Sequence, residues 1–188
     1  ALRSYWGATP AYQVMSPELV WPFFAKHPQY LQEAMGLLPN KSDNQWAGLS
    51  LEHALGVLQL FPHLPADLQP VVLELAFGES KTHRVLAQSV AGKLPDIEHL
   101  IIGQLTASKQ EHRLSAVLWC RRIKLLTALP TLKKAVITER SEVVRGHMLS
   151  TLEALGENIQ SFLTPEVLFA EAQKGGKGKV PAALEWFP

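Results

Sequence analysis

A proline-led pair of helical segments recurs three times in the middle of this 188-residue chain. The units begin at Pro65, Pro95 and Pro130, which lie 30 and 35 residues apart. In each unit an apolar helical segment leads through a short polar turn into a second helical segment with an arginine near its start (Arg84, Arg113 and Arg145). One helical pair cannot bury the apolar faces of both its helices, so such pairs stack on their neighbours. The repeat therefore predicts an all-α fold, a right-handed stack (α-solenoid) of antiparallel helical hairpins.

The residues before the repeats carry further helical signals. Ser16-Pro17 is typical of a helix start, and His27-Pro28 separates that helix from a second one expected over 28–38. A loop is expected over 39–48. Ser50 is then expected to cap a helix whose apolar residues lie on one face: Leu51, Ala54, Leu55, Leu58 and Phe61.

The end of the chain has a different character. A last helix is expected after Thr164-Pro165, whereas 174–188 contains a basic, glycine-rich stretch that is typical of a linker. We therefore expect one domain over 1–173, with irregular helices over 16–61, repeats over about 65–156 and a capping helix over 165–173. A linker and tail over 174–188 would follow.

The last repeat has the most specific pattern. Its second helical segment opens with Val143-Val144-Arg145 and closes with the run from Leu152 to Gly156, Leu-Glu-Ala-Leu-Gly. This pattern resembles the second helix of a HEAT repeat, and the resemblance covers roughly 65–156. It implies a curved HEAT-like stack whose second helices line the inner surface. The Pro-rich start and irregular tail also resemble an internal segment of the large bacterial WGR-domain proteins of the molybdate-metabolism-regulator type.

The composition limits the class of protein. Hydrophobic residues make up 47% of the chain, which is enough for a sizeable core. The single cysteine, Cys120, excludes a disulfide within the chain and fits a reducing compartment, so we expect a cytoplasmic protein. No apolar run approaches the roughly 18 residues that a membrane span needs. The chain begins at Ala1 and ends on Trp186-Phe187-Pro188, from which we expect a fragment of a longer bacterial protein.

Side chains that commonly carry chemistry form no catalytic pattern. None of the seven histidines is paired at the i, i+4 spacing of a zinc-binding helix. Cys120 could be a reactive thiolate beside two arginines, but its helical context is more typical of a small buried residue. Asp67 and Asp96 lie where helix first turns favour a negative charge. The stretch from Gly175 to Lys179 lacks the Ser or Thr of a phosphate loop. We predict no catalytic residue, no metal and no organic cofactor.

One feature does suggest a binding surface. Residues 109–145 hold nine Lys or Arg and three Glu, so their net charge is +6 within a chain of net charge +1. This segment is either a solvated helix surface or a surface for phosphate groups or acidic protein. Trp119 is either a stacking platform for a base or a core residue. The proposed anion- or partner-binding residues are Arg84, Arg113, Arg121, Arg122, Lys124, Lys133, Lys134 and Arg145.

These observations lead to three functional hypotheses. The first is a non-enzymatic interaction or scaffold module that binds a protein partner or other domains of its parent chain. The alternative is a domain that binds nucleic acid weakly and without sequence preference. That alternative resembles the HEAT-like alkylpurine DNA glycosylases, but the catalytic carboxylate implied by the resemblance has no match here. The third is a regulatory domain that helps its parent chain fold.

The aligned second helices also predict a core. Apolar residues recur in them at i, i+3 and i+4 spacing, which places these residues on one face of each helix. The residues expected to form a core shared between the second helices are Leu86, Val90, Leu114, Val117, Leu118, Leu149 and Leu152.

Overall fold

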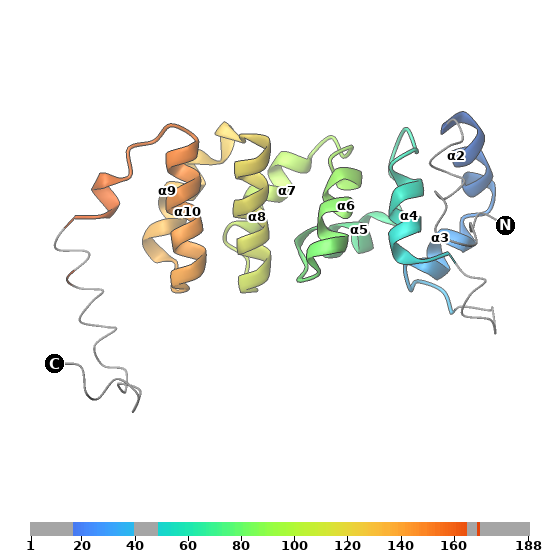
Figure 1. Ribbon diagram of the computed structural model, residues 1–188, viewed down its shortest axis with the longest axis horizontal. Coiled ribbons are helices and arrows are strands. Elements are labelled where there is room, and N and C mark those ends of the chain that lie inside the picture. The colour runs from blue at the N-terminus through green and yellow to red at the C-terminus, as the bar shows by residue number, and fades with distance from the viewer. Residues whose placement is uncertain (1–16, 40–48, 165–168, 170–188) are drawn as a thin grey trace, which may run out of the picture. The chain divides into compact units, whose positions relative to one another are not determined.

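The computed structural model describes residues 17–39, 49–164 and 169 of the chain. Within these residues every regular element is a helix and there is no strand, which confirms the all-α class (Figure 1). The helices are α2 (Pro17–Lys26), α3 (Gln29–Ala34), α4 (Leu51–Leu58), α5 (Gln69–Phe77), α6 (Lys81–Ala91), α7 (Ile97–Gln104), α8 (Gln110–Ile123), α9 (Leu129–Thr138) and α10 (Glu142–Ala154), with the short 3-10 helices η1 (Leu126–Ala128) and η2 (Gln160–Phe162).

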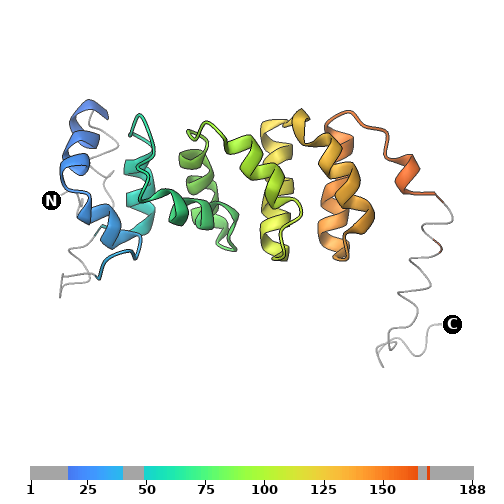
Figure 2. The ribbon, with the colours of Figure 1, turned by 180° about the vertical axis from the view of Figure 1, so that it is seen from behind.

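The chain divides into two compact units, the first running to Ala116 and the second starting at Val117. In the first unit α5 packs on α6 across the turn at 78–80, and α6 in turn contacts α4. Both α2 and α3 also pack on α4. Helix α5 lies behind α4 and α6 in Figure 1 and in front of them in Figure 2, so these helices form two layers.

The second unit begins within α8. The chain passes from α8 through η1 into α9, and α9 packs on α10. Helix α9 lies behind α10 in Figure 1 and in front of it in Figure 2. The helices α5 to α10 occupy the three predicted repeat segments, except that α9 begins one residue before Pro130.

Serine side chains cap three of the helices. The Oγ atoms of Ser50, Ser80 and Ser141 accept the backbone N–H three residues on, at 3.3, 3.4 and 3.4 Å. This confirms the predicted cap at Ser50. At the first two caps that third residue is a histidine, and the Nδ1 atoms of His53 and His83 lie 2.5 and 3.1 Å from the serine Oγ. Each cap satisfies a backbone donor that the first helical turn leaves without a partner.

The two aspartates expected to cap helices do not do so. Asp96 directly precedes α7, but its side chain makes no capping hydrogen bond. Asp67 lies one residue too early, because Leu68 is the residue that precedes α5. The Asp67 carboxylate instead accepts a hydrogen bond of 2.8 Å from the side-chain amide of Gln32. It therefore links the segment before α5 to α3.

The helix predicted over 28–38 is shorter than expected. Helix α3 ends at Ala34, because Gly36 adopts a left-handed conformation with φ +76°. The N–H of Gly36 bonds the carbonyl of Glu33 at 3.1 Å, and the N–H of Leu37 bonds the carbonyl of Gln32 at 2.8 Å. This pair of bonds is a Schellman motif, which ends a helix by reversing the local chain direction.

The predicted core of the second helices is only partly correct. Val90, Val117 and Leu152 are fully buried. The other four predicted core residues are only half-buried: Leu86, Leu114, Leu118 and Leu149. The prediction chose large aliphatic residues. Many of the buried positions instead carry Ala, Ser or Thr, which fit where helices pack closely. The buried positions that it missed on α6, α8 and α10 include Ala87, Ala91, Ser115, Ala116, Val144, Met148 and Thr151.

Several predicted segments lie outside the described residues. They are the loop from residue 40 to 48, most of the capping helix over 165–173, and the linker and tail over 174–188. The expected extent of the domain, 1–173, therefore stays a prediction.

Candidate functional site

Two of the arginines at the starts of the second helices hold the turns before those helices. The Arg84 guanidinium donates to the carbonyl of Glu79 at 2.9 Å. The Arg113 guanidinium donates to the carbonyls of Ala107 and Ser108, both at 2.9 Å. These contacts give Arg84 and Arg113 a structural role, because each one stabilises the turn that connects two successive helices.

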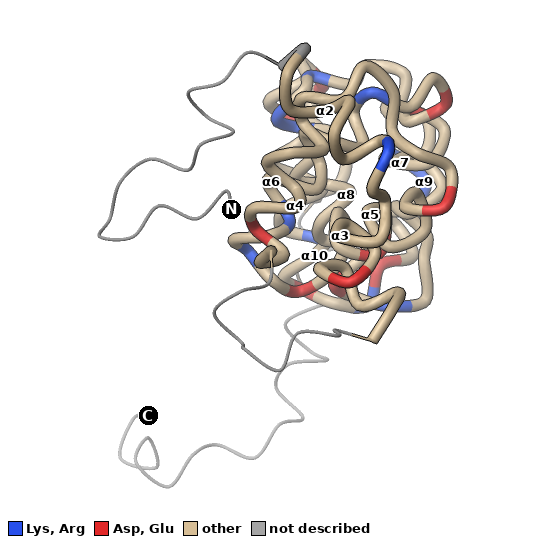
Figure 3. Tube along the Cα trace, turned by 90° about the vertical axis from the view of Figure 1, so that its right-hand side faces the viewer, with Lys and Arg blue, Asp and Glu red and all other residues tan. Residues whose placement is uncertain are grey.

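The other proposed basic residues belong to the second unit. Arg121 donates to the Ser150 hydroxyl of α10 at 3.2 Å. Lys133 forms an ion pair of 2.7 Å with Glu157, while Lys134 is exposed on α9. Arg145 is half-buried on α10. Figure 3 colours the Lys and Arg positions of the chain blue and the Asp and Glu positions red.

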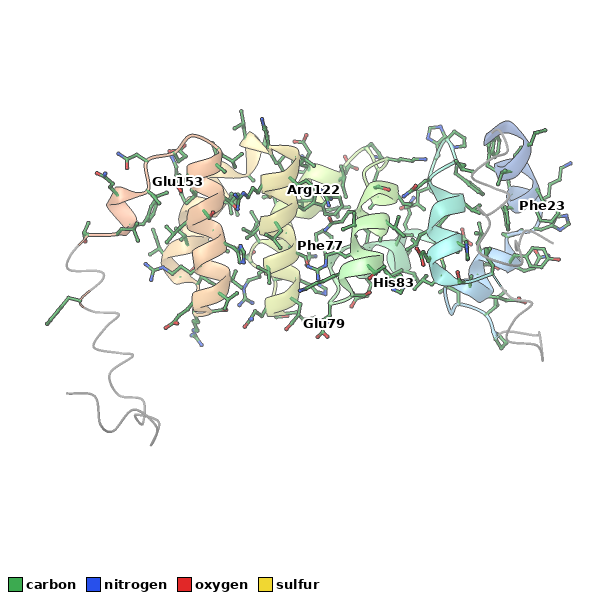
Figure 4. All side chains as sticks on the ribbon, viewed as in Figure 1. Phe23, Phe77, Glu79, His83, Arg122 and Glu153 are labelled. Atoms are coloured by element: carbon green, nitrogen blue, oxygen red, sulfur yellow. The ribbon has the colours of Figure 1, made fainter. Side chains whose placement is uncertain are left out.

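Three of the proposed basic residues gather at and just after the end of α8. Arg121, Arg122 and Lys124 are all exposed there (Arg122 is labelled in Figure 4). Two aliphatic residues of the same segment are also exposed, Ile123 by 45% and Leu126 by 60%. We call Arg121, Arg122, Ile123, Lys124 and Leu126 the basic edge.

Trp119 and Cys120 lie in the core. Trp119 is only 3% exposed, so it cannot act as a stacking platform for a base. Burial raises the pKa of the Cys120 thiol to about 12. Its thiolate is therefore scarce at neutral pH, and the interpretation of Cys120 as a small buried residue is confirmed.

An acid and an imidazole that sequence analysis did not connect meet in the first unit. Glu74 Oε1 of α5 lies 3.1 Å from Lys109 Nζ and 3.7 Å from His112 Nε2. On its other side, His112 Nδ1 lies 3.0 Å from the side-chain oxygen of Gln104. The hydrogen bond from Lys109 is the largest influence on Glu74 and, despite some burial, holds the pKa of this carboxyl below its ordinary value.

The same residues border a hollow of about 200 Å³ between α5, α7 and the start of α8. Glu74, Gln104 and His112 form its polar side. The hydrocarbon side is formed by Pro70, Leu73, Phe77 and Leu100. A carboxylate beside an imidazole can pass a proton, but none of the residues that line the hollow is a Ser, Thr or Cys that could attack a substrate.

The sequence did contain one signal for this group. His53, His83 and His112 recur at 30 and 29 residues, each in the first turn of its helix, α4, α6 or α8. The last of them, His112, contacts Glu74 on α5, the first helix of the preceding predicted repeat segment. This contact joins residues 38 positions apart, so the residues next to His112 in the sequence do not indicate it.

A cluster of exposed aromatic and aliphatic side chains lies on α2 and α3. The Phe23 and Tyr30 rings are stacked, with centroids 6.1 Å apart and planes 12° apart, and the His27 ring lies 4.8 Å from Phe23. Leu19, Phe23 and Tyr30 are 64%, 47% and 45% exposed. We call Leu19, Phe23, His27 and Tyr30 the aromatic face; Phe23 is labelled on α2 in Figure 4.

The described residues contain neither a cluster of metal-binding side chains nor a membrane-spanning helix. No three His, Cys, Asp or Glu side chains among them come together as a metal site would require. None of their helices combines the length and apolar character that crossing a lipid bilayer demands.

Comparison of the chain with protein-family models, curated proteins and solved structures finds no match. The function is therefore inferred from the surfaces and contacts of the chain itself.

Proposed function

We propose that this chain is a non-enzymatic protein-interaction module, built as a right-handed stack of antiparallel HEAT-like helical hairpins. Support for the stack comes from the packing of α5 on α6 and of α9 on α10, each pair joined by a short turn. The contact between α4 and α6 also supports it, because neighbouring second helices pack together in such repeats. The partner is another protein or another domain of the parent chain.

The observation that carries the proposal is the aromatic face. Three large apolar side chains of two short helices, Leu19, Phe23 and Tyr30, each expose nearly half of their surface or more. Single exposed apolar residues are common on protein surfaces, but contiguous ones mark interaction sites. Aromatic side chains are enriched in protein interfaces because they bury a large area while losing little conformational entropy.

The proposed lack of catalysis follows from what surrounds the ionisable groups. The chain has a single thiol, and it is buried. Glu74 and His112 do lie together, but Lys109 and Gln104 bond the same two side chains, and no nucleophile lines their hollow.

Nucleic-acid binding has less support. Trp119 is buried, and Arg84 and Arg113 bond carbonyls in their own turns. Electrophoretic retardation of DNA and RNA at two salt concentrations tests this alternative directly. Binding through phosphates would weaken steeply as salt rises.

Site-specific photocrosslinking in the source cells tests the proposed function. A benzophenone amino acid is placed at position 30 in place of Tyr30, and adducts are identified by mass spectrometry. The matched control is position 85, because Val85 is an exposed apolar residue of the same unit outside the aromatic face. We expect discrete protein adducts at position 30 that are lost in a Phe23→Ser background, and none at position 85. Equal labelling at both positions, or no protein adduct at position 30, would overturn the proposal.

A further inference from the structure

The basic edge combines positive charge with exposed hydrocarbon in six consecutive residues. Arg121, Arg122 and Lys124 supply three cations, and Ile123 and Leu126 supply the aliphatic surface. Only Leu125 turns inward, where it is 5% exposed. The segment therefore presents cations and exposed aliphatic side chains next to one another in the sequence.

The backbone explains this arrangement. Lys124 adopts a left-handed conformation with φ +53°. Its N–H bonds the carbonyl of Arg121 at 3.3 Å, and the N–H of Leu125 bonds the carbonyl of Cys120 at 2.9 Å, which is a Schellman motif with lysine where glycine is usual. The reversal directs Leu125 into the core and leaves its two aliphatic neighbours outside. The lysine keeps a charge at a position where glycine would be less strained.

Basic residues outnumber acidic ones in the unit that holds the edge. Residues 117–164 hold seven Lys or Arg against four Glu. Glu157 is paired with Lys133, and Glu139 accepts the backbone N–H of Ser141. The Lys124 side chain forms no hydrogen bond or ion pair with any residue that the structure describes. The edge therefore attracts an anionic partner.

The aliphatic side chains indicate which kind of anion fits. Binding phosphates would neutralise charge on the edge but would leave Ile123 and Leu126 without apolar contact. An acidic peptide that also carries Leu or Ile would pair its carboxylates with the cations and bury both aliphatic side chains. We propose that the basic edge binds an acidic protein segment that carries aliphatic side chains.

This surface is distinct from the aromatic face, which lies on α2 and α3 of the other unit. Crosslinking at position 30 and binding at the basic edge can therefore fail independently.

Fluorescence anisotropy with the full chain tests the proposal. The probes are a labelled short peptide of Asp, Glu, Leu and Ile, its twin with Ser in place of Leu and Ile, and a short single-stranded DNA. We expect the aliphatic peptide to bind at least about fivefold more tightly than its twin. Leu126→Ser should remove this preference without changing the affinity for the twin.

Two charge variants complete the test. Lys124→Gly removes a cation of the edge while relieving backbone strain, so it should weaken binding of the aliphatic peptide about fivefold although the fold is no less stable. The matched control Lys134→Ala removes an exposed cation of the same unit from α9 and should leave the affinity unchanged. Equal binding of both peptides, an equal loss in the two lysine variants, or tighter binding of DNA that Leu126→Ser does not alter would overturn the proposal.

Discussion

Lys93 Nζ lies 2.5 Å from the carbonyl oxygen of Phe61. The same ammonium lies 2.6 Å from the carbonyl oxygen of Gln59, so it bonds two carbonyls that follow α4. The last carbonyls of a helix have no partner within the helix, and a cation there also interacts favourably with the helix dipole. Lys93 thereby joins the segment after α6 to the segment after α4, and it lies 32 residues beyond Phe61 in the chain.

Replacing this ammonium should destabilise the first unit. Lys93→Met keeps most of the hydrocarbon chain but leaves the carbonyls to water, and we expect a loss of about 1–2 kcal/mol in the free energy of unfolding. Urea denaturation followed by circular dichroism measures it. The control is Lys81→Met, because the Lys81 side chain is exposed on α6 and forms no hydrogen bond or ion pair with a described residue. An equal change in both variants would show that the carbonyl contacts contribute nothing.

Two helices are followed by residues with a left-handed backbone, Lys124 and Gly156. Substitutions at these two residues should change stability in opposite directions. Lys124→Gly should raise the free energy of unfolding by about 1 kcal/mol, because a lysine is strained at φ +53° and glycine is not. Gly156→Ala should lower it by about 1 kcal/mol, because φ is +90° at that position. A Cβ at residue 156 would have no atom within 4 Å, so steric overlap cannot account for the loss. Thermal unfolding of both variants provides the measurement, and changes of the same sign would contradict the interpretation.

Two apolar residues of the second unit differ in how deeply they are buried, Met148 and Leu118. Met148 is completely buried, so Met148→Ala should cost about 2–5 kcal/mol. Leu118 is only half-buried, and Leu118→Ala should cost clearly less, on the order of half that amount. Denaturant titration of the two variants compares them directly. A larger loss for Leu118→Ala would mean that the buried face of α8 has been misassigned.

The contact between Glu74 and Lys109 predicts a small dependence of stability on pH. The pKa of Glu74 is lowered in the folded state, so the unfolded chain binds more protons just below the ordinary value of 4.5. The contribution is therefore fully present above that pH and is lost as the pH falls through the folded-state pKa. Glu74→Gln should flatten this part of the pH profile of the melting temperature. The effect should be small because the Glu74 side chain is 62% exposed. An unchanged slope below pH 4.5 would contradict the prediction.

Helices were more predictable from this sequence than the contacts between them. Prolines, serine caps and apolar spacing act within one helical turn, so they located α4 to α10 to within a few residues of their observed ends. Gly36 ends α3 through the same local chemistry, and that signal was available but not used. The buried face of α10 was not predictable in the same way, because Thr151 is buried by its neighbours in space and not by its own polarity.

The candidate surfaces were harder to predict for the same reason. The predicted surface combined Arg84 and Arg113, which recur at the starts of second helices, with Arg122 and Lys124 of the basic segment 109–145. The first two bond carbonyls in their own turns, and only the three-dimensional turn reveals those acceptors. The aromatic face was not predicted because Phe23 and Tyr30 belong to different helices, and their apolar character resembled that of core residues.

Helix α8 belongs to both units: Gln110 to Ala116 lie in the first, and Val117 to Ile123 lie in the second. The division between the units therefore falls inside a continuous helix. Separable domains are usually joined by an exposed linker instead. A protein truncated at Ala116 would keep only the first half of this helix, which is far shorter than the roughly 12 residues at which an isolated helix becomes marginally stable. Any attempt to divide this chain for expression or domain shuffling should retain α8 whole, through the reversal at Lys124.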